Sequence, residues 1–151
     1  LTDRRLVSEL INAKKRGVSV VVLWDSLGAI NFKNLFNELR KENIIVKAEN
    51  WGGKNHEKTI LADNKLLIGS ANFSSSGFNK NDENILVIEN NEIAKLYRDY
   101  FSYLFNTVDN KYLNYIPRAE GTESGNSCHD GIDNNFDGFK DLEDDGCKIK
   151  K

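Results

Sequence analysis

The chain has 151 residues and a formal net charge of −2, and 39% of its residues are hydrophobic and 29% charged. This size fits one domain with an appendage, and the charge is too close to neutral to indicate nucleic-acid binding by itself. No run approaches the roughly 18 apolar residues that a membrane-spanning helix needs, and no signal peptide is visible. Because the chain begins at Leu1 and contains no methionine, we expect it to be a fragment of a longer protein.

The charges are distributed unevenly along the chain. Residues 1–117 contain 16 Lys and Arg against 14 Asp and Glu, whereas residues 118–151 contain 5 against 9. The polar, glycine-containing stretch 118–127 lies between the two parts and is typical of a linker. We therefore expect a main domain over residues 1–117, a linker over 118–127 and an acidic tail over 128–151.

Helical and strand patterns alternate in the first third of the chain. Apolar residues recur at helical spacing over residues 2–17, which predicts a helix. The nearly continuous apolar stretch 18–24 predicts a strand buried on both faces of a sheet with parallel neighbours, and we expect Asp25 to form the turn after it. A second helix, capped by Asn31, and a short strand over 44–48 follow.

The middle of the chain carries a hairpin pattern. Residues 59–62 and 65–68 predict two short strands, joined by a tight turn at Asp63 and Asn64. The serine-rich stretch 74–82 is typical of a flexible loop over a ligand.

A further strand is predicted over residues 84–89, and a helix over residues 93–105. Aromatic side chains line one face of this helix, and we expect that face to pack in the core. The alternation of helices and strands predicts an α/β fold with a mixed β-sheet flanked by helices.

Polar side chains collect around the hairpin. His56 and Lys58 lie on one face of an extended segment, because side chains alternate along a strand. The return strand delivers Ser70 and Asn72, again two residues apart, towards the same end. An imidazole, an ammonium, a hydroxyl and a carboxamide would converge there, and such a set suits a phosphate group.

This spacing resembles the HKD motif of the phospholipase D superfamily, which reads H-x-K, four residues, D, and six residues to the serine of G-S-x-N. The matching residues are His56, Lys58, Asp63, Gly69, Ser70, Asn72 and, at a downstream acidic position, Glu83. The resemblance implies a phospholipase D-like α-β-α catalytic domain over residues 1–117. It also implies a catalytic step that needs no metal or other cofactor.

The resemblance assigns a role to each matching side chain. It implies that His56 is the nucleophile that forms a phosphohistidine, and that Glu83 orients and polarises its ring. Lys58, Ser70 and Asn72 would bind the phosphate oxygens. The two other motif residues, Asp63 and Gly69, are expected to be structural.

Many members of the superfamily carry two copies of the motif, whereas this chain contains one. The second histidine would come from an identical chain across a two-fold axis or from a missing N-terminal half. His129, the other histidine of this chain, has no lysine two residues after it.

The expected function is phosphodiester hydrolysis of the phospholipase D type, on phospholipid or nucleic acid. Two alternatives stay open. One is a phosphatidyl transferase that resembles cardiolipin synthase, and the other is a non-catalytic, calcium-dependent surface-binding module.

The acidic tail contains D-x-N-x-D-G, the start of an EF-hand-type calcium loop. The expected calcium ligands are Asp133, Asn135, Asp137, the carbonyl of Phe139, Asp141 and Asp144. An aspartate replaces the usual glutamate at the twelfth position, which weakens bidentate ligation. The tail resembles the aspartate-rich repeats of thrombospondin type 3, and the alternative is a disordered acidic segment.

The two cysteines, Cys128 and Cys147, bracket this loop. A disulfide between them would contribute about 3 kcal/mol by the chain-entropy estimate. A disulfide and a calcium loop both favour an extracellular or cell-surface location. Two cysteines and one neighbouring histidine do not favour zinc.

Overall fold

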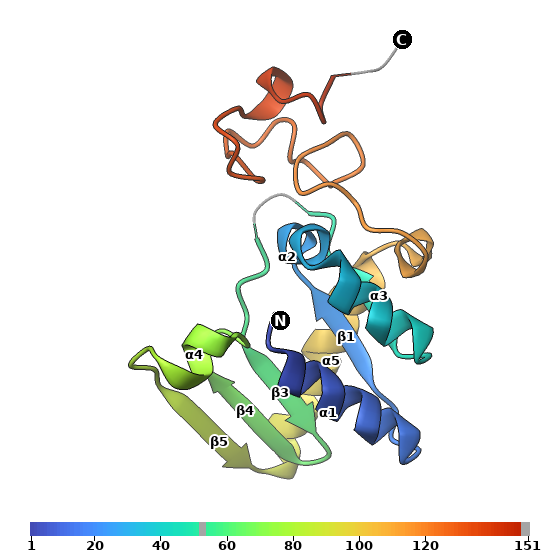
Figure 1. Cartoon of the computed structure of the whole chain (residues 1–151), viewed down its shortest axis with the longest axis vertical. Coiled ribbons are helices and arrows are strands. Elements are labelled where there is room, and N and C mark those ends of the chain that lie inside the picture. Colours follow the sequence, from blue (N-terminus) through green and yellow to red (C-terminus); the bar gives the residue numbers. More distant parts are fainter. Residues whose placement is uncertain (52–53, 149–151) are drawn as a thin grey trace. The chain divides into compact units, whose positions relative to one another are not determined.

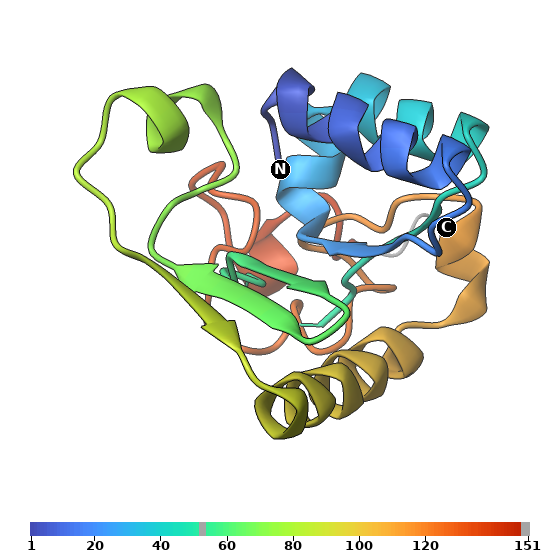
Figure 2. The same ribbon diagram turned by 90° about the horizontal axis from the view of Figure 1, so that it is seen from below.

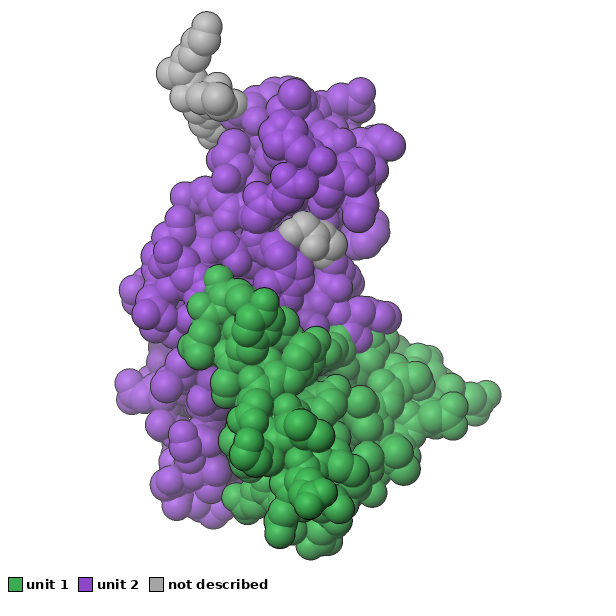
Figure 3. Space-filling view, turned by 180° about the vertical axis from the view of Figure 1, so that it is seen from behind, with its two compact units in different colours: residues 1–9, 57–107 green, residues 10–56, 108–151 purple. Residues whose placement is uncertain are grey.

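The computed structural model describes residues 1–51 and 54–148 (Figure 1). The chain forms two compact units, shown in different colours in Figure 3. Unit 1 contains Leu1–Glu9 and Glu57–Thr107, and unit 2 contains Leu10–His56 and Val108–Lys151. Helix α1 (Arg4–Lys15) belongs partly to each.

Unit 1 is built on an antiparallel sheet in the order β3-β4-β5, whose strands lie side by side in Figure 2. The strands are β3 (Thr59–Ala62), β4 (Lys65–Gly69) and β5 (Ile85–Glu89). The short helix α4 (Ser75–Asn79) lies between β4 and β5 in the sequence, and α5 (Asn91–Thr107) follows β5 and packs against β3 and β4.

The predicted hairpin is confirmed. Thr59 pairs with Ile68, and Ala62 pairs with Lys65. Asp63 has a φ of +54° at the turn, a left-handed conformation that aspartate tolerates better than most residues. The period-2 pattern therefore predicted both strands and their connection.

Unit 2 contains a parallel pair of strands, β1 (Val21–Trp24) and β2 (Ile45–Ala48). Two helices, α2 (Ser26–Asn31) and α3 (Lys33–Lys41), connect them. A 3-10 helix, η1 (Asn110–Leu113), packs against β2. The predicted strand over residues 44–48 is thus confirmed to within one residue.

The predicted strand over residues 18–24 is shorter and more exposed than expected. β1 begins at Val21, whose side chain is 38% exposed, and only Trp24 is buried in this strand. Among the described strands β1 pairs with β2 alone, so one edge is uncovered by sheet. Burial on both faces was therefore a wrong expectation.

The predicted cap of the second helix is also wrong. Asn31 is the last residue of α2, and α3 begins at Lys33 after Phe32, which makes no side-chain cap. The cap belongs to Asp25, whose carboxylate accepts the Gly28 N–H at 2.6 Å at the start of α2. Six residues with a glycine inside gave too weak a periodicity to predict α2.

Two further expectations for unit 1 need correction. The stretch 74–82 contains α4, which Ser74 caps by accepting the Gly77 N–H at 3.1 Å. The aromatic face of α5 is only partly packed: Tyr97 and Phe101 are half-buried, whereas Leu96 is 69% exposed. One side of α5 covers two short strands, and these are too narrow to bury the whole apolar stripe.

The expected single mixed sheet is not formed by the described residues. They form one parallel pair and one separate antiparallel sheet. The described residues between β2 and β3 form no helix or strand. Among the described strands β3 pairs only with β4, so no strand joins the two sheets. The α/β class itself is confirmed. None of the described helices has the length and apolar character needed to cross a bilayer.

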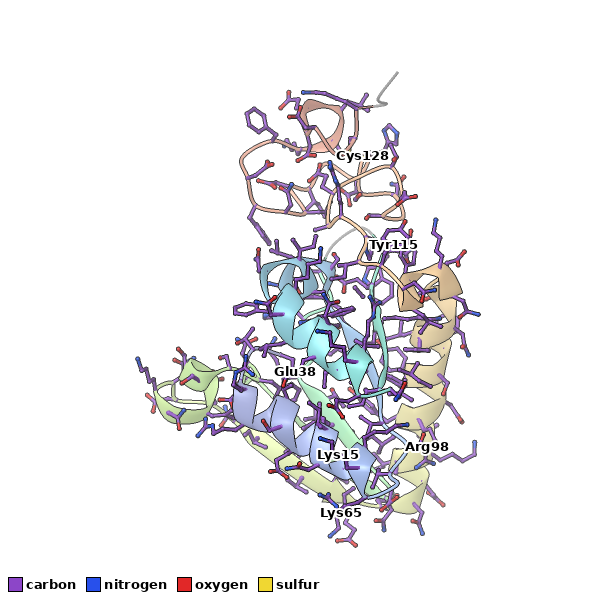
Figure 4. All side chains as sticks on the ribbon, turned by 45° about the vertical axis from the view of Figure 1, so that its right-hand side comes forward. Lys15, Glu38, Lys65, Arg98, Tyr115 and Cys128 are labelled. Carbon is purple, nitrogen blue, oxygen red and sulfur yellow. A yellow bond between two sulfur atoms is a disulfide. The ribbon has the colours of Figure 1, made fainter. Side chains whose placement is uncertain are left out.

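The tail is rich in loops and contains one 3-10 helix, η2 (Asp141–Glu143). Cys128, labelled in Figure 4, forms the expected disulfide with Cys147, with 5.6 Å between their Cα atoms. Glu120, from the stretch expected to be a linker, is buried and accepts the N–H groups of Asn134 and Asp141. Its carboxylate thereby fastens two turns of the tail together.

Candidate functional site

The antiparallel sheet of unit 1 brings three motif residues to the same end. Lys58 directly precedes β3, and Ser70 directly follows β4, its antiparallel neighbour. Glu83 lies two residues before β5, whose first residue pairs with Gly69. Strands of opposite direction thus gather side chains that are up to 25 residues apart in the chain.

Gly69 allows β4 and β5 to approach at this end. A Cβ atom there would lie 2.0 Å from the carbonyl oxygen of Asn84, which is far inside any allowed contact. The next residue, Ser70, donates its N–H to the Asn84 carbonyl at 3.0 Å, and its Oγ accepts the Asn84 N–H at 3.0 Å. A side chain at residue 69 would therefore push the two strands apart.

The Glu83 carboxylate, next to the point where β4 and β5 approach each other, is held by two side chains. Ser70 Oγ donates to Glu83 Oε2 at 2.5 Å, and Asn81 Nδ2 donates to Glu83 Oε1 at 3.0 Å. These hydrogen bonds, with the positive charge of Lys58, lower the pKa of Glu83 below its ordinary value. Glu83 is therefore ionised at neutral pH and held in one orientation.

The hydrogen bonds of Ser70 limit what it can do with a phosphate. A serine hydroxyl has one hydrogen to donate, and Ser70 gives it to Glu83. While that bond is present, Ser70 orients Glu83 instead of donating to a phosphate oxygen. Its role in phosphate binding stays a prediction from the resemblance.

Lys58 and its two neighbours follow the predicted alternation. Lys58 is only 8% exposed. On the opposite face, Glu57 Oε1 accepts a hydrogen bond from Tyr100 Oη at 3.0 Å, and Thr59 Oγ1 lies 3.5 Å from Tyr97 Oη. Helix α5 thus holds the strand through the residues that flank Lys58.

The loop that carries Asn72 is fixed by its backbone. The Asn72 carbonyl accepts the Ser74 N–H at 2.7 Å, and a Cβ on Gly77 would lie 2.1 Å from the same oxygen. Helix α4 can therefore pack on Asn72 only because residue 77 is glycine. The Asn72 side chain is exposed, as a phosphate-binding group needs to be.

His56 and Asp63 complete the set of predicted residues. His56 is exposed and is the last residue of the first segment of unit 2, directly before unit 1. Asp63 lies at the hairpin turn, where its carbonyl oxygen accepts a hydrogen bond from Arg98 at 2.6 Å. The structural role of the Asp63 side chain stays a prediction.

Two supporting residues were missed by sequence reasoning. Asn81 was treated as part of a flexible loop, although an amide two residues before an acidic side chain is well placed to bond it. Gly77 carried no signal, because its close approach to Asn72 depends on the packing of α4. Trp51 is half-buried, and residues 52 and 53, which follow it, lie outside the described residues.

Residues 1–105 match the family model described as "Cardiolipin synthase, PLD-like domain". The chain belongs to the phospholipase D-like family. It is 34% identical over 115 residues to "Phospholipase D" of Rickettsia conorii, covering 76% of this chain and 54% of that protein. It is 31% identical over 106 residues to "Mitochondrial cardiolipin hydrolase" of Mus musculus, covering 69% and 48%.

A solved structure of the family is similar to this chain. The phospholipase D family member Nuc from Salmonella typhimurium superposes with a TM-score of 0.68 at 27% sequence identity, covering 72% of this chain and 74% of Nuc. This phospholipase D-like chain spans about half the length of the curated relatives it matches. The family match ends before the acidic tail.

The tail of this phospholipase D-like chain brings only some of the expected calcium ligands together. Asn135 Nδ2 donates to Asp137 Oδ2 at 3.2 Å and to Asp144 Oδ2 at 2.8 Å. Asp133 instead accepts backbone N–H groups from residues 137 and 138, and Asp141 accepts those of residues 130 and 131. Within the described residues, no group of three or more His, Cys, Asp or Glu side chains is arranged to hold a metal ion.

Phe139 and Gly138 were expected at positions seven and six of the calcium loop. Phe139 donates its N–H to Asp137 Oδ1 at 2.9 Å, and its side chain is exposed. Gly138 has a φ of +96°, so the turn does fall on a residue that favours the left-handed region. The loop thus has the turn of a calcium site but only a partial set of convergent oxygens.

Proposed function

We propose that this chain carries one phosphodiester-cleaving site of the phospholipase D type, with His56 as the nucleophile. The observation that supports it best is the fixed carboxylate of Glu83, which Ser70 and Asn81 hold beside the charge of Lys58. A carboxylate kept ionised and held by two hydrogen bonds among exposed polar groups is an arrangement that catalysis needs and folding does not.

The proposed reaction has two displacements at phosphorus. An imidazole nitrogen of His56 attacks phosphorus, a P–N bond forms, and the P–O bond to the leaving group breaks as that oxygen takes a proton from a general acid. Water then attacks the phosphohistidine and releases the free imidazole. Lys58 and Asn72 would stabilise the charge on the non-bridging oxygens, while Glu83 stabilises the cationic ring.

The test uses the two histidines of the chain as a matched pair. His56→Ala should abolish hydrolysis of bis-p-nitrophenyl phosphate, whereas His129→Ala should leave the rate unchanged. An acid-labile, alkali-stable phosphoryl group should be trapped on the wild-type protein and be lost in His56→Ala. Full activity in His56→Ala would overturn the proposal.

The relatives support a phospholipid as the substrate. The rickettsial relative is a phospholipase D by name, and the mouse relative is a cardiolipin hydrolase. We therefore propose a lipid phosphodiester, with nucleic acid as the competing substrate. Release of headgroup from phosphatidylcholine or cardiolipin vesicles should exceed cleavage of plasmid DNA, and phosphatidylethanol formed in added ethanol would identify a phosphatidyl transferase.

A single motif supplies one nucleophile, so the general acid is proposed to come from a second motif. That motif belongs to a second copy of the chain or to the remainder of a longer protein. If a second copy supplies it, activity in mixtures of wild-type and His56→Ala chains should fall with the square of the wild-type fraction. A linear fall would show that each chain acts alone.

We also propose that the tail binds Ca²⁺ and that the protein works outside the cell or at its surface. The D-x-N-x-D-G spacing and the turn at Gly138 support the first proposal, and the disulfide supports the second. Calcium should raise the Tm of the wild-type chain but not that of Asp137→Ala, with Glu143→Gln as a matched control. EDTA should lower the stability of the tail and leave turnover unchanged.

A further inference from the structure

Glu49 is a buried acidic residue that the proposed reaction does not use. It follows β2 directly, and its N–H donates to the Trp24 carbonyl at 2.9 Å, which extends the β1–β2 pairing by one residue. Its side chain is 1% exposed. A carboxyl group at such a place costs stability unless its oxygens are well bonded, so its surroundings show what it does.

The bonds to the Glu49 carboxyl come from backbone groups. Oε1 accepts the N–H of Asn55 at 3.5 Å, and the backbone of Ser26, at the start of α2, acts to lower the pKa of the carboxyl group. Among the described residues, Oε2 has no hydrogen-bond partner. The like charge of Asp25 opposes ionisation of the Glu49 carboxyl.

These contacts connect the β1–β2 pair of unit 2 to the start of the HKD motif. Ser26 is the buried first residue of α2, whereas Asn55 directly precedes His56. Glu49 therefore joins the sheet to the chain one residue before the proposed nucleophile. Its oxygen contacts the backbone N–H of Asn55, at a point that lies outside the helices and strands.

We propose that Glu49 is a positioning residue for His56, which it holds in place by anchoring the backbone at Asn55. The inference rests on the proposed function, because it gives His56 the role of nucleophile. A nucleophile must be held within a fraction of an ångström, and a displacement of about 1 Å can cost about 100-fold in rate.

The contact between the Glu49 carboxyl and the Asn55 N–H should depend on pH. Burial, and secondarily the charge of Asp25, raise the pKa of Glu49 to about 8, so the carboxyl is neutral at pH 7. Above pH 8 a buried negative charge forms beside Asp25, and the segment that carries Asn55 must shift to admit water. The pH dependence of kcat should therefore include an alkaline decline that belongs to Glu49.

Three variants test this positioning role, with Glu42→Gln, a partly exposed carboxyl of the same unit, as the control. Glu49→Ala should lower kcat about 10-fold and leave KM within about twofold. Glu49→Gln keeps an acceptor for Asn55 and should retain kcat at pH 7 but lose the alkaline decline near pH 8. Glu49→Asp, one methylene shorter, should fold and still lower kcat.

A chemical probe separates this inference from the proposed function. Diethyl pyrocarbonate modifies exposed imidazoles, and His129 provides an internal reference. Glu49→Ala should change the modification rate of His56 by about threefold or more and leave that of His129 unchanged. This result would support positioning even if the chain proved to have no phosphodiesterase activity.

A Glu49 variant that behaves like wild type would contradict the positioning role. The variant to measure is Glu49→Ala, or Glu49→Asp if the alanine variant does not fold. If its His56 modification rate, kcat and pH profile equal those of wild type, Glu49 is structural only. The inference would then be overturned while the role of His56 in catalysis stood.

Discussion

Ser70 Oγ lies 2.5 Å from Glu83 Oε2 and donates its only hydrogen to it. The same oxygen accepts the N–H of Asn84, so both ends of the hydroxyl are fixed. Ser70 therefore sets the direction of the Glu83 carboxylate.

Ser70→Ala should reduce kcat by about 10- to 100-fold with little change in KM, since the orientation of Glu83 affects the charged transition state more than ground-state binding. Ser76→Ala, an exposed serine of α4, is the control. Steady-state kinetics on bis-p-nitrophenyl phosphate provide the measurement. A Ser70→Ala variant that loses affinity but keeps kcat would favour direct phosphate binding by Ser70.

Asn81 should act on the charge of Glu83. Removing its hydrogen bond in Asn81→Ala should raise the pKa of Glu83 towards the ordinary value and move the acid limb of the kcat profile to higher pH. Asn79→Ala, in the preceding turn, should leave that limb in place. NMR titration of the Glu83 side chain in the two variants would measure the pKa directly.

Gly69→Ala should destabilise unit 1. The added methyl group would collide with the Asn84 carbonyl at 2.0 Å and separate β4 from β5, at a cost of about 3 kcal/mol. For a chain of this size the Tm should fall by roughly 6–12 °C. Gly121→Ala, where the nearest atom lies 3.3 Å away, is the matched control and should change Tm far less.

The buried carboxyl of Glu49 should make stability depend on pH. Its folded pKa of about 8 lies above the value of 4.5 expected when the chain is unfolded, so the folded state holds the proton more tightly. Its contribution is complete below pH 4.5 and is lost as the pH rises towards 8, by at most about 5 kcal/mol. Urea unfolding of wild type and Glu49→Gln should be measured from pH 5 to 9. The free energy of unfolding of wild type should fall over this range relative to that of Glu49→Gln.

Opening the disulfide should affect the tail alone. Reduction, or the double variant Cys128→Ser with Cys147→Ser, should lower the stability of the tail by about 3 kcal/mol. Limited proteolysis should then cut between residues 128 and 147, while the rate of phosphodiester hydrolysis should stay within about twofold of wild type. Equal loss of both would show that the tail supports the catalytic part.

Local patterns predicted what depends on neighbours in the sequence. The hairpin of β3 and β4 was correct because alternation and the Asp63 turn act over a few residues. The antiparallel strands also bring Lys58, Ser70 and Glu83 to one end of the sheet, and their roles in the HKD motif stay a prediction.

The remaining features depend on contacts between distant residues. In the sequence Glu49 looks like a loop residue, and only the β1–β2 pairing shows that it is buried. The aromatic stripe of α5 predicted a core helix, but the width of the sheet decides how much of the stripe is covered. The calcium pattern predicted the turn at Gly138 correctly, but it made Asp141 a ligand, whereas its carboxylate accepts the backbone N–H groups of residues 130 and 131.

β5 is an edge strand among the described residues, and it exposes Ile85, Leu86 and Val87 in succession. Unpaired backbone groups next to apolar side chains act as a template for another strand. At millimolar concentration the isolated chain should therefore gel or precipitate as sheet-rich aggregates. A lysine in place of Val87 is the simplest route to samples concentrated enough for crystals or NMR.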